Sequence, residues 1–209
     1  MSKVTVLAVR YLANASPALC RELGVPEGYS ALGMLTTDCD DATYIALDAA
    51  TKASDVEVAY GRSFYAGAGN ASTPNAGEVL GILAGRTPGA VKSGMEAALS
   101  ELNRLSFTEI HGVPYLAHTV SSVGTYLAKE AGIRSGSAAA YLIAPPLEAM
   151  YALDAALKAA DVTLCKLYAP PSETNFGGGL LAGTQSACEA ACAAFAAAVA
   201  EVAANPKMH

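Results

Sequence analysis

The stretch ALDAATKASDV, at residues 46–56, returns as ALDAALKAADV at residues 152–162. Nine of the eleven positions are identical, and the two stretches begin 106 residues apart, about half the length of this 209-residue chain. A period of that size predicts two copies of one domain, because the repeats of solenoid proteins are shorter. We therefore expect a first domain at residues 1–105 and a second at residues 106–209. Subunits with such internal pseudosymmetry commonly assemble further by symmetry.

The similarity continues on both sides of this stretch. Residues 19–25 match residues 127–133 in pattern at a spacing of 108, and residues 82–85 match residues 180–183 at a spacing of 98. The first copy therefore has eight more residues before the last matched segment. These extra residues fall in the connection at residues 60–77, which is rich in Gly, Ala, Ser, Asn and Pro.

Composition narrows the class of protein. Hydrophobic residues make up 53% of the chain and charged residues only 15%, against roughly 25% charged residues in ordinary soluble domains. So few charges predict that part of the surface is covered by self-association. The net charge is −6 and no basic stretch stands out, which argues against nucleic acid and anionic membranes as partners.

No secretion signal or membrane span is expected. The chain begins with an alternating strand pattern and has no apolar core of a signal peptide there. The most apolar run, residues 187–204, is mostly alanine and carries Glu189 and Glu201. That composition predicts a packed helix in preference to a bilayer span.

The reactive side chains form no familiar catalytic or metal-binding pattern. The five cysteines are odd in number and lie inside regular segments, which indicates reduced thiols in an intracellular protein. His111, His118 and His209 are scattered without metal-ligand spacing. Ser63 lies in no G-x-S-x-G elbow, and residues 67–69 lack the rest of a dinucleotide fingerprint. We therefore expect no catalytic residue, no metal and no cofactor.

Hydrophobic periodicity predicts an α+β fold in which both copies share one order of elements. In the first copy we expect strands at residues 4–11, 31–37, 56–60 and 78–85, and helices at residues 16–24, 40–54 and 88–102. In the second we expect strands at residues 115–120, 139–144, 162–168 and 179–183, and helices starting near residues 122, 146 and 186, with residues 105–113 as the linker. This order favours an open sheet with helices on one face, the other face being exposed or covered by partners.

Carboxylates gather around the start of the helix expected at residues 40–54. Asp38, Asp40 and Asp41 precede or open it, and they either cap the helix and stabilise its dipole or belong to a binding site. Glu78 opens an otherwise apolar strand, as a solvated strand end or as a ligand for a small cation. One alternative function is an enzyme or sensor in which Asp40, Asp41 and Glu78 perform acid–base work at a subunit cleft.

Two loops occupy corresponding places in the copies, at residues 60–77 and residues 170–179. Both are rich in Gly or Pro and carry aromatic residues. Glycine gives the backbone freedom that a gate requires, and an unusually long loop in a compact domain is often functional. The loops are therefore either ordinary surface connections or the lining of an opening on a symmetry axis.

Several segments resemble the bacterial microcompartment shell domain. They are SALGMLTT at residues 30–37, the repeated ALDAAxKAxDV stretch, and ILAG at residues 82–85 followed by a helix. Two copies in one chain resemble the tandem-domain, trimer-forming shell proteins. Four further motifs resemble the ethanolamine-utilisation members of that family: DCDDATY at residues 38–44, YGRSFYAGA at 60–68, APPLEA at 144–149 and PPSETN at 170–175.

The resemblance, which covers nearly the whole chain, implies two tandem, circularly permuted shell domains, each an open sheet with helices packed on it. It implies a homotrimer, a six-lobed pseudohexamer that tiles with other shell proteins into a microcompartment shell in the cytoplasm. It also implies a loop-gated central pore and small channels that bind ethanolamine through Asp40, Glu78 and Thr174. The implied pore-loop residues are Phe64, Tyr65, Ala66, Gly67, Ala68, Gly69, Asn70, Glu173, Thr174, Asn175 and Phe176. The chain departs from the family pattern in a shorter linker at residues 105–113 and a more glycine-rich run at residues 176–179.

Overall fold

The computed structural model describes residues 2–64, 77–170, 172 and 174–207. The chain divides into two compact units. The N-terminal unit consists of Lys3–Leu105 together with Gly124–Leu127, and the C-terminal unit of Met1–Ser2, Ser106–Val123 and Ala128–His209. Both units mix helices with an antiparallel sheet, as the sequence predicts. That residues 1–105 and 106–209 are each a complete shell domain stays a prediction.

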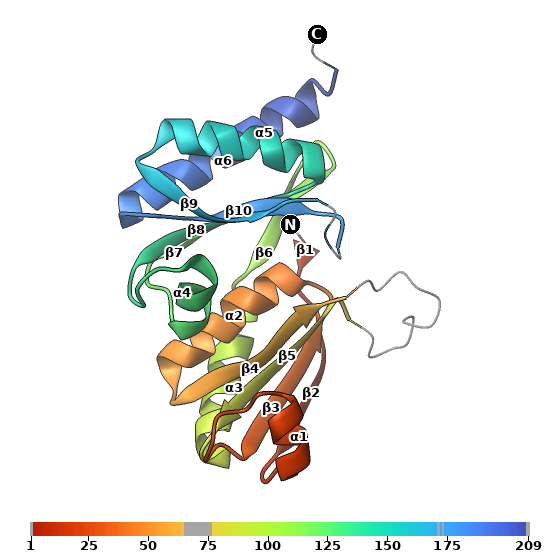
Figure 1. Ribbon diagram of the computed structural model, residues 1–209. Helices are drawn as coiled ribbons and strands as arrows, with labels where there is room; N and C mark the ends of the chain where they lie inside the picture. The colour runs from red at the N-terminus through yellow and green to blue at the C-terminus, as the bar shows by residue number, and fades with distance from the viewer. Residues whose placement is uncertain (1, 65–76, 171, 173, 208–209) are drawn as a thin grey trace. The chain divides into compact units, whose positions relative to one another are not determined.

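The sheet of the N-terminal unit has four antiparallel strands (Figure 1). Their order is β2 (Val6–Leu12), β3 (Ala31–Thr37), β5 (Val79–Gly85) and β4 (Val56–Ser63). Two helices, α2 (Asp40–Ala53) and α3 (Pro88–Leu102), pack on one face. Glycines make the close approach possible, since a Cβ added at Gly33 would lie 2.7 Å from the Val91 side chain of α3.

The opposite face of this sheet is also covered in part, by the short helix α1 (Pro17–Glu22) and the chain around it. Leu32 and Ile82 belong to a second core cluster there, with Cys20 and Leu23 packed against them. Because alternate residues of a strand point to opposite faces, Leu32 and Gly33 of β3 serve the two different layers. The expectation of helices on one face only was therefore wrong for this unit.

The second sheet has six strands in the order β1 (Ser2–Lys3), β6 (Ser106–Ile110), β7 (Val113–Val120), β8 (Ala138–Ala144), β10 (Gly177–Gly183) and β9 (Val162–Tyr168). The helices α5 (Pro146–Ala159) and α6 (Gln185–Ala204) lie together across one face of it (Figure 1). Leu142, Leu153 and Phe195 are buried between the layers among many alanines. The remaining short helix, α4 (Thr125–Ala131), begins in the segment that folds with the N-terminal unit.

The expected linker at residues 105–113 contains a strand. Residues of β6 pair with β7 in an antiparallel hairpin, with Ile110 opposite Val113. The two residues between them, His111 and Gly112, have φ values of 50° and 81°. Positive φ at both central positions is the signature of a type I′ turn, whose twist matches that of the flanking strands.

Among the described helices, α6 has the length and hydropathy of a membrane-spanning helix. Its residues Cys188, Ala191, Phe195 and Val199 are nevertheless fully buried in the core of the C-terminal unit. A helix that contributes this many side chains to a protein core is accounted for by packing, as its alanine-rich sequence predicts.

The two short helices end in the same local structure. After α1 the Val25 amide donates to Cys20 O at 2.9 Å, and in the second copy the Ile133 amide donates to Ala128 O at 3.0 Å. Gly24 and Gly132, with φ values of 66° and 65°, occupy the left-handed position that ends each helix. The spacing of 108 residues is therefore a structural equivalence as well as a sequence match.

Candidate small-molecule site and loop ends

Glu78 is held beside the start of α2 by its backbone. Its amide donates to Thr37 O at 2.8 Å, and its carbonyl accepts from the Phe64 amide at 3.0 Å. The preceding Gly77 is buried, and a Cβ added there would lie 2.2 Å from Thr37 O. Only glycine allows this approach, so the sequence Gly77-Glu78 fixes the carboxylate next to the acidic cluster that follows β3.

The acidic cluster consists of Asp38, Asp40, Asp41 and Glu78. Asp40 and Asp41 are buried in the first turn of α2, where carboxylates stabilise the positive end of the helix dipole. Asp40 Oδ1 accepts from the Asp41 amide at 2.9 Å, and Asp38 Oδ1 accepts from the Thr5 amide at 2.7 Å. The dipole role expected for these residues is therefore present.

The capping role expected for Asp40 or Asp41 was wrong. The residue at the N-cap is Cys39, whose amide donates to the hydroxyl of Thr37 at 3.1 Å. Thr37 and Thr43 also share a hydrogen bond of 2.7 Å between their hydroxyls. Two threonines therefore organise the start of the helix, and the carboxylates are one position too late in the sequence to cap it.

Electrostatics single out Glu78. Burial of its half-buried side chain, and then the negative charges of Asp40 and Asp38, raise the pKa of Glu78 from 4.5 to about 6. The ionised carboxylate is therefore repelled by its neighbours. A positive charge placed among these groups would be favoured by all of them.

Tyr44 adds a hydroxyl close to the cluster. Burial, followed by the charges of Asp40 and Asp41, raises the pKa of Tyr44 to about 12, although a hydrogen bond with Ser63 opposes this shift. The phenol therefore stays neutral and can donate a hydrogen bond. Tyr44 belongs to the DCDDATY motif, but a lone tyrosine on a helix carries no spacing signal from which a role could be predicted.

The corresponding region of the C-terminal unit is ordered by Ser172. Its hydroxyl accepts from the Phe176 amide at 3.1 Å and donates to Phe176 O at 2.6 Å. The Phe176 ring meets the ring of Phe107 edge-on, with 6.0 Å between centroids. Asn175 lies in the left-handed region, with φ of 61°, and Thr174 is half-buried in the same turn.

The glycine-rich run at residues 176–179 belongs largely to a strand. The expected loop at residues 170–179 ends at Phe176, because β10 begins at Gly177. A Cβ added at Gly178 would lie 1.8 Å from Leu142 O of the neighbouring strand. These glycines therefore serve close strand packing, and the expected loop at residues 170–179 extends too far, because Gly177, Gly178 and Gly179 belong to β10.

The structure brings some of the predicted site residues together. Asp40 and Glu78 interact in the N-terminal unit, and Asp41, like both of them, lies close to Cys39. Thr174 belongs to the C-terminal unit, so its place in the same site stays a prediction. Phe64 is exposed at the end of β4. The predicted pore residues Tyr65, Ala66, Gly67, Ala68, Gly69, Asn70 and Glu173 lie outside the described residues. Within the described chain, no group of His, Cys, Asp or Glu side chains is arranged to hold a metal ion.

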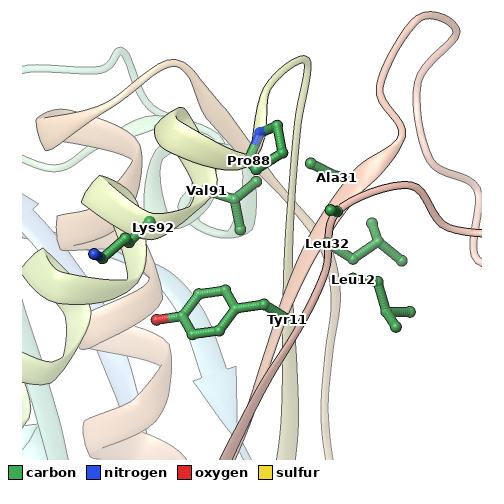
Figure 2. Close-up of a pocket in the computed structure, with 8 residues that line it drawn as sticks. Tyr11, Leu12, Ala31, Leu32, Pro88, Val91 and Lys92 are labelled. Carbon is green, nitrogen blue, oxygen red and sulfur yellow. The ribbon is translucent and has the colours of Figure 1, made fainter.

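A pocket of about 290 Å³ lies elsewhere in the N-terminal unit, between β2, the start of β3 and α3 (Figure 2). Its lining is almost entirely apolar: Tyr11 of β2 lies on the same side as Val91 and Lys92 of α3, whereas Leu12 points to the opposite side of the strand. No carboxylate lines it. This pocket therefore does not coincide with the acidic cluster and does not match the chemistry of a small cation.

Comparison with known proteins defines the class to which this fold belongs. The BMC domain family matches residues 31–114. The crystal structure of ethanolamine utilization protein EutL from Leptotrichia buccalis superposes with a TM-score of 0.95 at 57% identity, covering 100% of this chain and 98% of that one. The fold is thus that of a microcompartment shell protein with two BMC-like units.

The relatives narrow the class further. The bacterial microcompartment shell protein EutL of Clostridium perfringens is 58% identical over 205 residues, covering 96% of this chain and 94% of the relative. The EutL of Escherichia coli is 48% identical over 206 residues, covering 97% and 94%. This chain belongs to the EutL family of bacterial microcompartment shell proteins. It is a structural component of the shell and not an enzyme, so acid–base catalysis by Asp40, Asp41 and Glu78 is no longer the alternative.

Proposed function

We propose that this shell subunit forms a homotrimer and binds a small ammonium-bearing metabolite at the acidic cluster of each N-terminal unit. Three chains would supply six similar units around a threefold axis, in agreement with the internal repeat. The low charge content of the chain supports extensive self-association. Tiling of such trimers with other shell proteins would then build the flat wall of the compartment.

The observation that carries the ligand proposal is the raised pKa of Glu78. Burial first, and then the negative charges of Asp40 and Asp38, disfavour the ionised form of this carboxylate. An ammonium group bound between Glu78 and Asp40 would relieve this repulsion and gain charge-assisted hydrogen bonds. A neutral metabolite would gain neither.

Ethanolamine fits this chemistry. It carries an ammonium group for the carboxylates and a hydroxyl group, for which the Thr174 side chain is a suitable partner. The Leptotrichia buccalis relative is named for ethanolamine utilization. We extend that substrate to this chain, with Asp40 and Glu78 binding the ammonium and Thr174 the hydroxyl.

Calorimetric titration with ethanolamine tests the site. Glu78→Gln keeps the shape and removes the charge, so it should weaken binding roughly tenfold or more, the value of one charge-assisted contact. Glu57→Gln is the matched control, because Glu57 is an exposed carboxylate of β4 in the same unit. Wild-type affinity should also rise from pH 5 to pH 7 as Glu78 ionises. Equal affinities of the two variants, or no binding of ethanolamine by the wild type, would contradict the proposed site.

We also propose that the segments after β4 and before β10 line a gated pore on the trimer axis. Phe64, the first residue of the segment after β4, is exposed. Thr174, in the segment before β10, is half-buried. Sizing with light scattering should give the mass of three chains, and electron microscopy of concentrated protein should show sheets. A monomer at micromolar concentration would contradict both the trimer and the pore.

A further inference from the structure

One face of α2 is covered by the segment Gly124–Leu127, which folds with the N-terminal unit. The Asp48 side chain, 0% exposed, accepts hydrogen bonds from the Gly124 amide at 2.7 Å and from the Leu127 amide at 2.9 Å. Lys52 lies 3.3 Å from the same carboxylate. Asp48 therefore binds two backbone amides at the start of α4, amides that a helix cannot satisfy internally.

Aromatic packing extends the same contact. The rings of Tyr44, on α2, and Tyr126 lie with centroids 6.2 Å apart. A Cβ added at Gly124 would lie 2.2 Å from the Thr51 hydroxyl, so the segment approaches α2 as closely as glycine permits. The face of α2 around Asp48 is thus a specific binding surface for a short segment of chain.

The repeat places the same surface on α5, where it is exposed. Asp154 corresponds to Asp48 at the spacing of 106 residues, yet its side chain is 62% exposed and pairs with Lys158 at 2.5 Å. Around it lie exposed apolar side chains, namely Leu147 at 65%, Met150 and Tyr151. Exposed apolar side chains gathered on one face of a helix are a feature of protein interaction surfaces.

The repeat also identifies the segment that fits this surface. Residues 16–19 correspond to residues 124–127 at the spacing of 108, and the chain that follows has the same turn in both copies. Leu127 is 1% exposed in its contact, whereas the equivalent Leu19 is 42% exposed. Within the described chain, the side chain of Ser16 makes no capping hydrogen bond to its helix. Surface and segment are therefore both exposed where their equivalents are buried against each other.

We propose that the exposed face of α5 binds residues 16–19 of a second copy of this chain. The Asp154 carboxylate accepts hydrogen bonds from the amides of Ser16 and Leu19, as Asp48 does from Gly124 and Leu127. Each chain offers one such face and one such segment, and a head-to-tail contact with a threefold rotation closes into a ring of three chains. The inference rests on the trimer proposed above and names the contact that holds it together.

Cross-linking between chains tests the contact. By the same equivalence, Met150 and Ala18 take the places of the neighbouring Tyr44 and Tyr126. A mixture of one chain with Ala18→Cys and another with Met150→Cys, treated with a short bismaleimide, should give linked chains on a denaturing gel. Wild type and each variant alone give the background from the native cysteines. Tyr44→Cys with Tyr126→Cys in one chain is the matched control, and its link should form within single chains.

The outcomes separate the contact from the trimer. Linked chains from the mixture, above background, support the contact. A trimer by light scattering that gives no such link, while the Tyr44 and Tyr126 control links internally, overturns the contact and leaves the trimer standing. A wild-type protein that is monomeric by light scattering overturns both.

A second measurement removes the carboxylate alone. Asp154→Ala should raise the dissociation constant of the trimer by roughly tenfold or more, because two amides lose an ionised acceptor. Asp161→Ala, which removes another exposed carboxylate just after α5, is the matched control and should leave assembly unchanged. Equal dissociation constants for the two variants would overturn the role of Asp154.

Discussion

Asp48 and Asp154 occupy the same position of the same eleven-residue repeat, yet one is buried and the other is exposed. Both are followed four residues later by a lysine that pairs with them. The difference lies in what covers the helix: residues 124–127 bind the face of α2, and no described segment does so on α5. The repeat thus gives α2 and α5 the same surface, but it does not determine which segment of chain covers that surface in each copy.

The largest expected effect is that of Asp48→Ala. It removes the acceptor of the Gly124 and Leu127 amides and leaves buried donors without a partner, so the free energy of unfolding should fall by about 3 kcal/mol. Urea titration at several protein concentrations measures it. The loss for Asp48→Ala should not depend on concentration, whereas any loss for Asp154→Ala should grow on dilution, since it acts through assembly. The same concentration dependence for both variants would contradict the claim that Asp48 acts within one chain and Asp154 between chains.

A smaller effect is expected where the two copies differ in the strand before their last helix. Gly178 of β10 corresponds to Leu80 of β5 at the spacing of 98. Gly178→Ala would place a Cβ against Leu142 O and should cost about 2 kcal/mol, because backbone cannot yield as a side chain can. Leu80→Ala loses only part of a half-buried side chain and should cost about 1 kcal/mol. Thermal unfolding of both variants is the measurement, and a reversed order would contradict the packing described for β10.

The acidic cluster makes stability depend on pH. The pKa of Glu78 is raised to about 6 in the folded protein from 4.5, so folding favours the protonated carboxyl. Its contribution to stability is present below pH 4.5 and is lost as the pH rises through 6. Because the side chain is half exposed, we expect about 1 kcal/mol.

Urea titrations across this pH range, at fixed protein concentration, check the effect. Glu78→Gln should flatten the pH dependence of the free energy of unfolding, and the control Glu57→Gln should keep it. If the pH dependence of Glu78→Gln matches that of the wild type, the claim that the pKa of Glu78 is raised in the folded protein is contradicted.

The smallest expected effect is the difference in stability between two equivalent glycine variants, which should be close to zero. Gly24→Ala and Gly132→Ala each put a side chain on a left-handed residue with open space around it. Each should cost about 1 kcal/mol through backbone strain alone. Because the two turns are equivalent, the two costs should agree, and chemical denaturation of both variants compares them directly. A difference well above the experimental error would show that the copies are not locally alike.

The bounds of helices and strands were predicted correctly where the hydrophobic pattern agrees with the residues that start or end an element. The strand β3 and the helix α3 have the predicted bounds, because Thr87-Pro88 opens the helix and an apolar run between polar ends marks the strand. The hairpin of β6 was missed because its turn is His-Gly, in which a histidine takes the positive φ that asparagine usually supplies. The helix α1 was predicted, but the face of the sheet that it covers was not. Alternation along a strand shows which residues share a face and does not show which helix covers that face.

The candidate site was predictable only in part. Asp40 and Glu78 come together because Gly77 lets the backbone before Glu78 lie against the end of β3, and that approach follows from contacts between distant strands. The Thr37 hydroxyl accepts from the amide of the N-cap residue Cys39, and this role was not expected, since the carboxylates nearby are stronger capping candidates by type. Thr174, in the other unit, stays a prediction of the family resemblance.

Hydrogen exchange at two equivalent amides, Leu19 and Leu127, tests the central claim most directly. Exchange would be followed on the wild-type protein at concentrations above and below the dissociation of the trimer. The Leu127 amide, bound to Asp48 within one chain, should be protected at every concentration. The Leu19 amide should be protected to a similar degree in the trimer and should exchange rapidly in the monomer. A Leu19 amide that exchanges rapidly in both states would contradict the claim that the second copy reproduces between chains the contact that the first copy makes within one.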